Sequence, residues 1–234
     1  MTDLSDFDIT KKWPARHPDR IQLYSLPTPN GIKASAMLEE TGLAYEPHLV
    51  SFGSDDQMTP EFLSLNPNNK IPAMIDPNGP DGKPLGIWES GAILMYLAEK
   101  TGQFLSSDPV ERYHTIQWLM FQMGGAGPMF GQFGFFHKFA GKEIEDKRPY
   151  ERYQNESRRL LGVMDKRLQK SEYIATGEYS IADIALWPWI RTLSGFYEAG
   201  EELGLSEFAA VNAWLEKCSS RPASRKAVNI PERD

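Results

Sequence analysis

The order of strand-like and helix-like segments between residues 21 and 102 most constrains what this chain can fold into. Short apolar runs alternate with stretches of helical composition, and a turn-rich segment, DPNGPDGKP, separates the last two runs as a hairpin loop would. The strand candidates are 21–26, 45–50, 71–75 and 85–88, and the helix candidates are 31–40 and 90–102. The pattern predicts an α/β domain with the order β-α-β, a connector, then β-β-α.

The sequence changes in character after this domain. No convincing strand follows, and helical patterns cover 110–123, 149–170, 181–197 and 207–220. Ser180 and Asp183 form a capping-box pattern that starts the third of these helices. We therefore expect an α/β domain followed by an all-α domain. The expected boundaries are an N-terminal extension at 1–20, the α/β domain at 21–102, a linker at 103–109, the helical domain at 110–226 and a tail at 227–234.

The extension is expected to be an extended arm, because Pro14 and Pro18 discourage regular structure. Two structural alternatives remain open for this extension. Trp13 could anchor the arm across a neighbouring subunit, or the arm could be a disordered tail.

Composition excludes several classes of function. The chain has a net charge of −7 and no basic cluster, so we expect no nucleic-acid partner. No stretch approaches the roughly 18 apolar residues of a membrane span, and no signal peptide is evident. Cys218 is the only cysteine and the four histidines are scattered, so neither a disulfide nor a metal site is expected. A cytoplasmic protein without a metal is the expectation, with Cys218 as a packing residue.

The segment SLPTPNG at 25–31 follows the first strand and leads into the first helix. The order of elements suggests a thioredoxin-like domain, but the cysteine pair that such a domain carries here is absent. Thr28 can cap the helix, and Pro29 suits its first turn. Simple capping and a role in chemistry both remain open for Thr28.

Two further segments carry residues that invite a functional interpretation. In NPNNKIPAM, Pro72 stands at the start of an apolar strand, where a cis Ile71–Pro72 bond would turn the Ile71 backbone outward to pair with an extended peptide. A trans proline on an edge strand is the alternative. In WESGAILMYL, Glu89 and Ser90 begin a helix, where backbone N–H groups favour a carboxylate ligand. Ordinary helix capping is again the alternative.

These motifs together resemble the glutathione transferases. NKIPA, ESGAILMYLAEKTG and YSIADIALWPW carry the resemblance, which extends from about Ile21 to Ala223. TPNG, together with the segments 116–132 and 151–160, is similar to the Nu class of that family. The resemblance implies a thioredoxin-like domain followed by a helical domain, a homodimer, and glutathione as co-substrate, with one or two molecules at each site.

The resemblance also implies which residues act. The reactive atom would be the thiol of glutathione, and Thr28 and Asn30 would be the catalytic residues that stabilise its thiolate. The Ile71 backbone would pair with the cysteinyl part, Glu89 and Ser90 would hold the γ-glutamyl amine and carboxylate, and Arg152 would take a carboxylate unless it lies on a solvated helix face. The implied glutathione contacts are Asn30, Gln57, Lys70, Ile71, Pro72, Glu89, Ser90, Gln132, His137 and Arg152.

The expected activity is glutathione-dependent reduction of small-molecule disulfides by thiol–disulfide exchange. Two alternatives remain. One is a conventional transferase or peroxidase that acts on electrophiles, and the other is a non-catalytic glutathione-binding regulatory protein on the same fold.

Overall fold

The computed structural model describes residues 4–232 and divides the chain into two units. The first unit joins the residues up to Thr101 with the segment that begins at Pro222, and the second unit is Gly102–Arg221. The last helix of the chain therefore groups with the α/β unit, whereas the sequence pattern assigned residues 222–226 to the helical domain. Within residues 4–232, no helix has the length and apolar character needed to cross a membrane.

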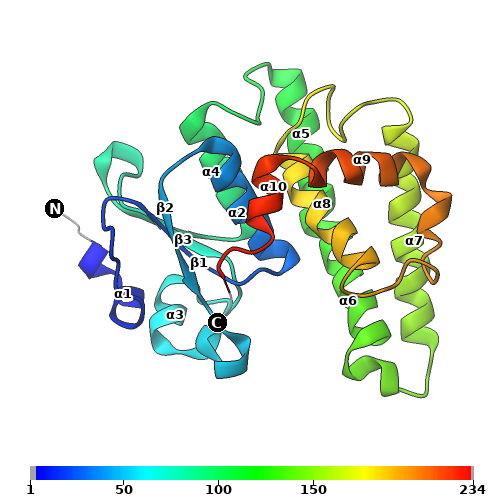
Figure 1. The fold of residues 1–234 in the computed structure, drawn as a ribbon, viewed down its shortest axis with the longest axis horizontal. Coiled ribbons are helices and arrows are strands. Elements are labelled where there is room, and N and C mark those ends of the chain that lie inside the picture. Colours follow the sequence, from blue (N-terminus) through cyan, green and yellow to red (C-terminus); the bar gives the residue numbers. More distant parts are fainter. Residues whose placement is uncertain (1–3, 233–234) are drawn as a thin grey trace. The chain divides into compact units, whose positions relative to one another are not determined.

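The first unit is built on a four-stranded sheet in the order β2-β1-β3-β4 (Figure 1). The strands are β1 Ile21–Ser25, β2 Tyr45–Leu49, β3 Ala73–Asp76 and β4 Leu85–Trp88. β2 runs parallel to β1, while β3 is antiparallel to both β1 and β4. All four strands occur where the sequence predicted them. Pro47 lies on an edge strand, as its missing N–H requires.

Helices surround this sheet. The α-helices of the first unit are α1 Ile9–Lys12, α2 Pro29–Thr41, α3 Pro60–Leu65, α4 Ser90–Thr101 and α10 Pro222–Ala227. Its short 3-10 turns are η1 Leu4–Asp6, η2 Phe52–Ser54, η3 Asp56–Met58 and η4 Pro80–Gly82. Helix α2 packs against α4 and α10, and α1 packs against α3. Gly42 and Gly102 follow α2 and α4 with φ of 67° and 68°, the left-handed backbone that ends a helix.

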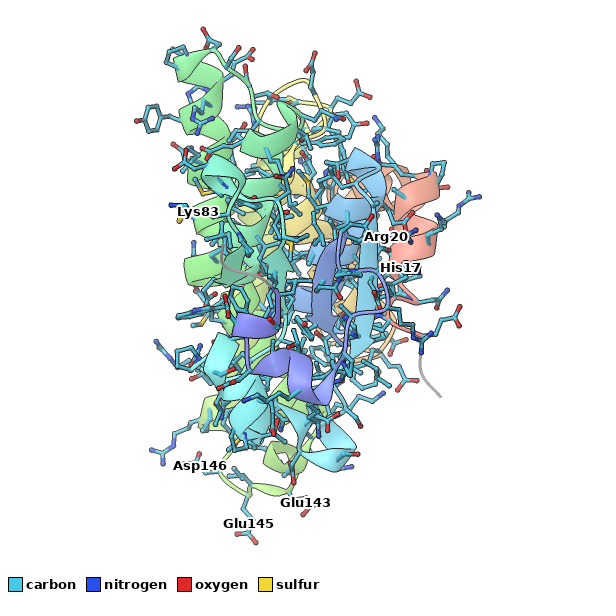
Figure 2. All side chains as sticks on the ribbon, turned by 90° about the vertical axis from the view of Figure 1, so that its left-hand side faces the viewer. His17, Arg20, Lys83, Glu143, Glu145 and Asp146 are labelled. Atoms are coloured by element: carbon cyan, nitrogen blue, oxygen red, sulfur yellow. The ribbon has the colours of Figure 1, made fainter. Side chains whose placement is uncertain are left out.

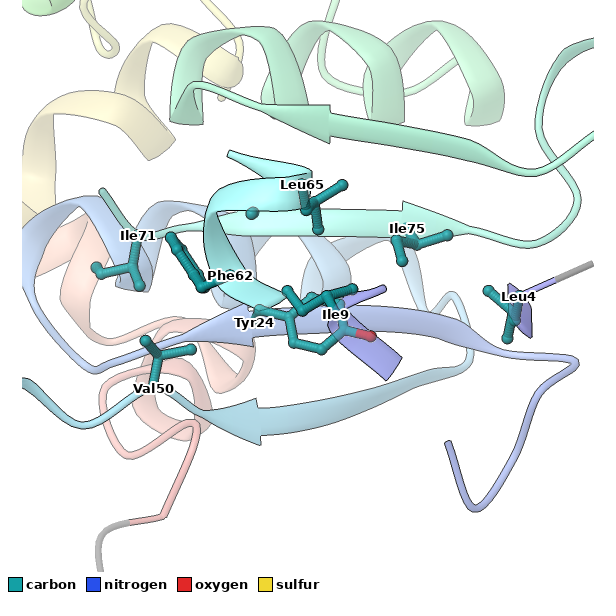
Figure 3. Packing of buried hydrophobic residues seen from close by; sticks show 9 residues of the cluster. Leu4, Ile9, Tyr24, Val50, Phe62, Leu65, Ile71 and Ile75 are labelled. Atoms are coloured by element: carbon teal, nitrogen blue, oxygen red, sulfur yellow. The ribbon is translucent and has the colours of Figure 1, made fainter. Parts of the chain in front are cut away.

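The N-terminal extension is part of the first unit, and the expectation of an extended arm is wrong for its described part. Residues 4–6 and 9–12 are helical, and Leu4 and Ile9 are buried with Tyr24 and Phe62 in one core cluster (Figure 3). The indole N–H of Trp13 donates to the Leu49 carbonyl at 2.9 Å. The two prolines follow α1 in the chain, so they end this helix instead of preventing it. Residues 1–3 lie outside the described part.

Among its described residues, the second unit contains helices joined by turns and no strand, as predicted. It contains α5 Pro109–Phe121, a π-helical segment η5 Gln122–Ala126, α6 Gly127–Lys138, η6 Ala140–Glu143, α7 Arg148–Leu168, α8 Ile181–Ser194, η7 Leu205–Glu207 and α9 Ala209–Ser219. The predicted capping box of Ser180 and Asp183 is present at the start of α8. Glu143 at the end of η6 and Glu145 and Asp146 in the loop before α7 project from this region (Figure 2).

Candidate functional site

The register of the sheet brings the motif segments of the first unit to one edge. Tyr24 pairs with Ala73, and Ala73 pairs with Trp88, across three adjacent strands. The turn after β1, the Ile71–Pro72 bond before β3 and the residues after β4 therefore emerge at the same end of the sheet. β2 is parallel to β1 and also finishes there, and Figure 3 shows Ile71 and Val50 at this end. We call this end the site edge.

The turn after β1 forms a capped helix N-terminus at the site edge. Thr28 is the N-cap of α2, and its Oγ1 accepts a hydrogen bond from the Gly31 N–H at 3.3 Å, as the sequence predicted. Pro29 and Asn30 are the first two residues of the helix. Gly31 is required here, because a Cβ at this position would lie 1.9 Å from the Leu26 carbonyl oxygen. The turn therefore places a hydroxyl, an amide and the positive end of the α2 dipole together.

The segment before β3 takes one of the two forms that the sequence left open. The Ile71–Pro72 bond is cis, and both residues are buried. The pairing of β3 with β1 begins at Ala73, so the Ile71 backbone lies outside the ladder of the sheet. Lys70 is exposed on the loop that precedes it, and the Asn66 side chain donates to the Lys70 carbonyl.

Glu89 and Ser90 follow β4 and start α4. Glu89 is exposed and has a φ of 71°, a left-handed backbone that residues other than glycine rarely adopt and that is found disproportionately at functional sites. Ser90 is buried, and the Lys33 ammonium of α2 lies 3.2 Å from its hydroxyl oxygen. Burial lowers the pKa of Lys33 to about 7, and the negative charge of Glu89 opposes this shift.

Lys33 was not among the residues predicted from the sequence. The one available signal is a single lysine within the apolar stretch 32–38, at positions that the structure shows to be buried.

Gln57 lies on η3, in the connection that follows β2. Its Oε1 is buried and has no hydrogen-bond partner. The neighbouring Asp56 carboxylate accepts from the Ser51 N–H at 2.8 Å and pairs with Lys12 at 3.0 Å. These contacts hold η3 against the N-terminal extension and against the residues that follow β2. An unsatisfied buried acceptor costs free energy, which makes Gln57 a candidate partner for an N–H of a ligand.

The remaining predicted residues belong to the second unit. Gln132 is exposed on α6. The His137 ring shares a hydrogen bond of 3.1 Å with the Tyr197 carbonyl and stacks on Phe133, which favours a packing role for it. Arg152 is exposed on α7 and lines a hollow of about 440 Å³ together with Met129, Tyr153, Asn155, Glu156 and Arg159.

The site edge offers two helix N-termini, an unpaired segment of backbone and a buried amide acceptor. Helix N-termini bind carboxylates, and exposed backbone pairs with extended peptides. Within residues 4–232, no three His, Cys, Asp or Glu side chains gather as a metal site would require. The chemistry of the edge therefore fits a small anionic peptide.

A sheet of this topology joined to a helical unit, with such an edge, defines the architecture of a glutathione transferase. The family model for the glutathione S-transferase N-terminal domain matches residues 20–99, and the model for the C-terminal domain matches residues 128–222. The chain belongs to the glutathione S-transferase family, which confirms the resemblance found in its sequence.

Individual members of the family are also similar to this chain. The chain is 47% identical over 211 residues to the disulfide-bond oxidoreductase YfcG of Escherichia coli. The aligned region covers 89% of this chain and 94% of YfcG. A Pseudomonas putida glutathione transferase with one glutathione disulfide bound per subunit superposes with a TM-score of 0.97 at 63% identity, covering 98% of this chain and 100% of that one. A Burkholderia graminis glutathione transferase with two glutathione molecules per subunit gives 0.98 at 66% identity, covering 100% and 98%.

Proposed function

We propose that this protein is a glutathione-dependent disulfide-bond oxidoreductase. The observation that carries the proposal is the Thr28 turn at the site edge, which can stabilise a thiolate although no cysteine lies near it in the sequence. The names of its relatives agree with this activity, since YfcG is a disulfide-bond oxidoreductase and the P. putida enzyme holds glutathione disulfide.

Glutathione would supply the reactive atom. A free thiol has a pKa near 8.5 and is mostly protonated at neutral pH. The Thr28 Oγ1 accepts from Gly31, so its own proton remains available for donation to a sulfur anion, and the Asn30 amide is a second donor. Together with the α2 dipole, these donors favour the thiolate and lower the pKa of the bound thiol.

The reaction is thiol–disulfide exchange in two steps. The first glutathione thiolate attacks one sulfur of the disulfide substrate, forms a mixed disulfide and releases the other half as a thiolate. A second glutathione thiolate then attacks the glutathione sulfur of the mixed disulfide and releases the remaining half. Two glutathione molecules are oxidised to one glutathione disulfide, and the substrate gains two electrons and two protons.

The other proposed contacts are those that the resemblance implies, and the site edge is compatible with them. The Ile71 backbone next to Pro72 would pair with the cysteinyl residue of glutathione. Glu89 and Ser90 would hold the γ-glutamyl amine and carboxylate, and the unpartnered Gln57 oxygen would accept an amide N–H. Lys70, being exposed and cationic, would pair with the glycyl carboxylate.

The second glutathione would use residues of the second unit. Arg152 provides a planar cation for a carboxylate, and Gln132 provides an exposed amide. Of the three residues predicted there, His137 is the weakest candidate because its ring already contacts Tyr197 and Phe133.

A comparison of two assays tests the function. Turnover of a small disulfide with glutathione is expected to exceed conjugation of glutathione to a chloro-nitrobenzene, and the reverse ranking would identify a conventional transferase. Calorimetric titration with glutathione runs in parallel, because binding without turnover over several disulfides would indicate a regulatory protein.

We also infer a homodimer in the cytoplasm. Val110, Tyr113 and Met120 are exposed apolar residues on α5 and would suit a contact with a second copy, which sedimentation at micromolar concentration measures directly. A reaction that consumes reduced glutathione fits the cytosol, where glutathione keeps thiols reduced.

A further inference from the structure

Lys33 carries a charged group into the interior of the first unit. It lies on α2 with none of its surface exposed. Burial of an ammonium group costs free energy, and an apolar side chain of similar volume would fill the same space without this cost. A charged group retained in such a place, with a pKa displaced by burial, is a candidate for a role in a site.

The position of Lys33 connects two parts of the site edge. It follows Asn30 by three residues, so both lie on one face of α2. Its Nζ is 3.2 Å from the Oγ of Ser90, the first residue of α4. Lys33 therefore joins the helix of the thiolate turn to the helix that would hold the γ-glutamyl group.

The hydrogen bond between Lys33 and Ser90 has a defined donor when Lys33 is protonated. A protonated lysine has three donors and no acceptor. When Lys33 is protonated, the Ser90 oxygen accepts in this contact, and the hydroxyl proton of Ser90 is then directed to a different group. An apolar residue at position 33 would remove this constraint on the hydroxyl.

We propose that Lys33 is a positioning residue of the glutathione site, which orients the Ser90 hydroxyl as a donor to the α-carboxylate of the γ-glutamyl group. The inference rests on the proposed function, because it assumes that Ser90 meets this carboxylate. Lys33 acts through Ser90 and does not touch the ligand. If the contact served only to join α2 to α4, it would change stability without affecting the choice of ligand.

The test compares two ligands by calorimetry. One is glutathione, and the other is γ-aminobutyryl-cysteinylglycine, which is the same peptide without the α-carboxylate. The wild-type protein is expected to prefer glutathione by at least ten-fold, and Lys33→Met is expected to reduce this preference about ten-fold by weakening glutathione alone.

A matched control removes a lysine charge from a different contact of α2. Lys226 of α10 pairs with Glu39 of α2 at 2.7 Å on the surface. Lys226→Met is expected to leave both affinities and their ratio at the wild-type values.

A cycle with Ser90→Ala isolates the contact. In the Ser90→Ala background, Lys33→Met is expected to cause no further loss of glutathione affinity. Lys33→Arg keeps a donor-only cation, so it is expected to retain most of the ligand preference, and it also serves if the methionine variant does not fold. Equal weakening of both ligands by Lys33→Met, or additive losses in the cycle, would overturn the role of Lys33. A wild-type protein that binds the two ligands equally would instead overturn the γ-glutamyl assignment on which the proposal rests.

Discussion

Thr28 and Asn30 are the residues of the proposed site that would stabilise the thiolate of glutathione, a thiol that the chain itself does not supply. Helix α2 presents its first N–H groups at the site edge, and the Thr28 oxygen already satisfies the Gly31 N–H. The Thr28 hydroxyl and the Asn30 amide are both donors of a kind suited to a sulfur anion.

Removal of either donor should slow the chemical step. We expect Thr28→Ala and Asn30→Ala to lower kcat for disulfide reduction ten- to a hundred-fold, since a hydrogen bond to a charged group contributes about 1.5–3 kcal/mol. The apparent pKa of the bound thiol should rise in the pH profile of kcat. Thr28→Ser keeps the hydroxyl and should stay near wild type. Full turnover with an unchanged pH profile in both alanine variants would mean that Thr28 is only a cap.

Glu89 has a backbone conformation that glycine would adopt more easily. Its φ of 71° costs about 1–2 kcal/mol for a residue with a Cβ. We expect Glu89→Gly to change the free energy of unfolding by no more than about 1 kcal/mol, because relief of this cost is offset by the greater flexibility of the unfolded chain. Glutathione affinity should nevertheless fall ten-fold or more through loss of the partner for the γ-glutamyl amine.

Asp81 provides the matched control for Glu89→Gly. It also has a positive φ, of 57°, but it lies in the hairpin loop between β3 and β4. Asp81→Gly should give a similar change in unfolding free energy by urea titration and no change in glutathione affinity. Retention of affinity in Glu89→Gly would remove Glu89 from the site.

At the scale of elements, the N-terminal extension is joined to the edge strand β2 through Glu46. The Glu46 carboxylate accepts from the Arg16 N–H and, at 2.8 Å, from the His17 N–H. Burial alone would raise the pKa of Glu46, but these backbone donors together with the charges of His48 and His17 outweigh it and lower the pKa below its ordinary value of 4.5. A carboxyl whose folded pKa is depressed stabilises the fold above its unfolded pKa, and this contribution is lost as the pH falls through the folded value.

Glu46→Gln should therefore destabilise the protein in a pH-dependent way. At pH 7 the free energy of unfolding should fall by about 1.5–3 kcal/mol, the range for hydrogen bonds to a charged group. The difference from wild type should narrow as the pH decreases below 4.5, because protonated Glu46 and glutamine are then both neutral. Urea titrations at pH 7 and pH 3.5 measure both values. A difference that is the same at the two pH values would show that the carboxylate charge does not stabilise the arm.

Elements with strong local signals were predictable from the sequence, and those that depend on distant contacts were not. The strands and the helices α2 and α4 follow from apolar runs, a cap and glycine stops, which are local features. Helix α6 is not among the predicted helices, because glycines and Pro128 interrupt the helical pattern of the sequence there. Pro128 nevertheless suits the first turn of a helix. Helix α1 has only four residues and depends on burial of Ile9 against the sheet, which no local pattern reveals.

The same distinction applies to the candidate site. Thr28, Pro72, Glu89 and Ser90 belong to short motifs, and the structure brings their segments to one edge through the strand register. Lys33 could not be found in this way, because a lysine gives no sign of burial until α2 and α4 pack together.

At the scale of the whole molecule, the chain contains a single thiol and that thiol is removed from solvent. Cys218 on α9 has no exposed surface. The structure therefore confirms Cys218 as a packing residue and agrees with a reaction whose thiols all come from glutathione and its substrates.

Cys218→Ser tests whether the reacting thiols come from the ligands and not from the protein. We expect disulfide reduction to stay within about three-fold of wild type, less than 1 kcal/mol in the barrier, because Cys218 takes no part in the exchange. The free energy of unfolding should fall by about 1–3 kcal/mol, since a hydroxyl replaces a thiol in an apolar interior. A thiol reagent should label the native wild-type protein only slowly and label it fully after unfolding in urea. If the serine variant stays folded by circular dichroism but loses its activity, the chain itself supplies an essential thiol and the ligand-thiol mechanism is wrong.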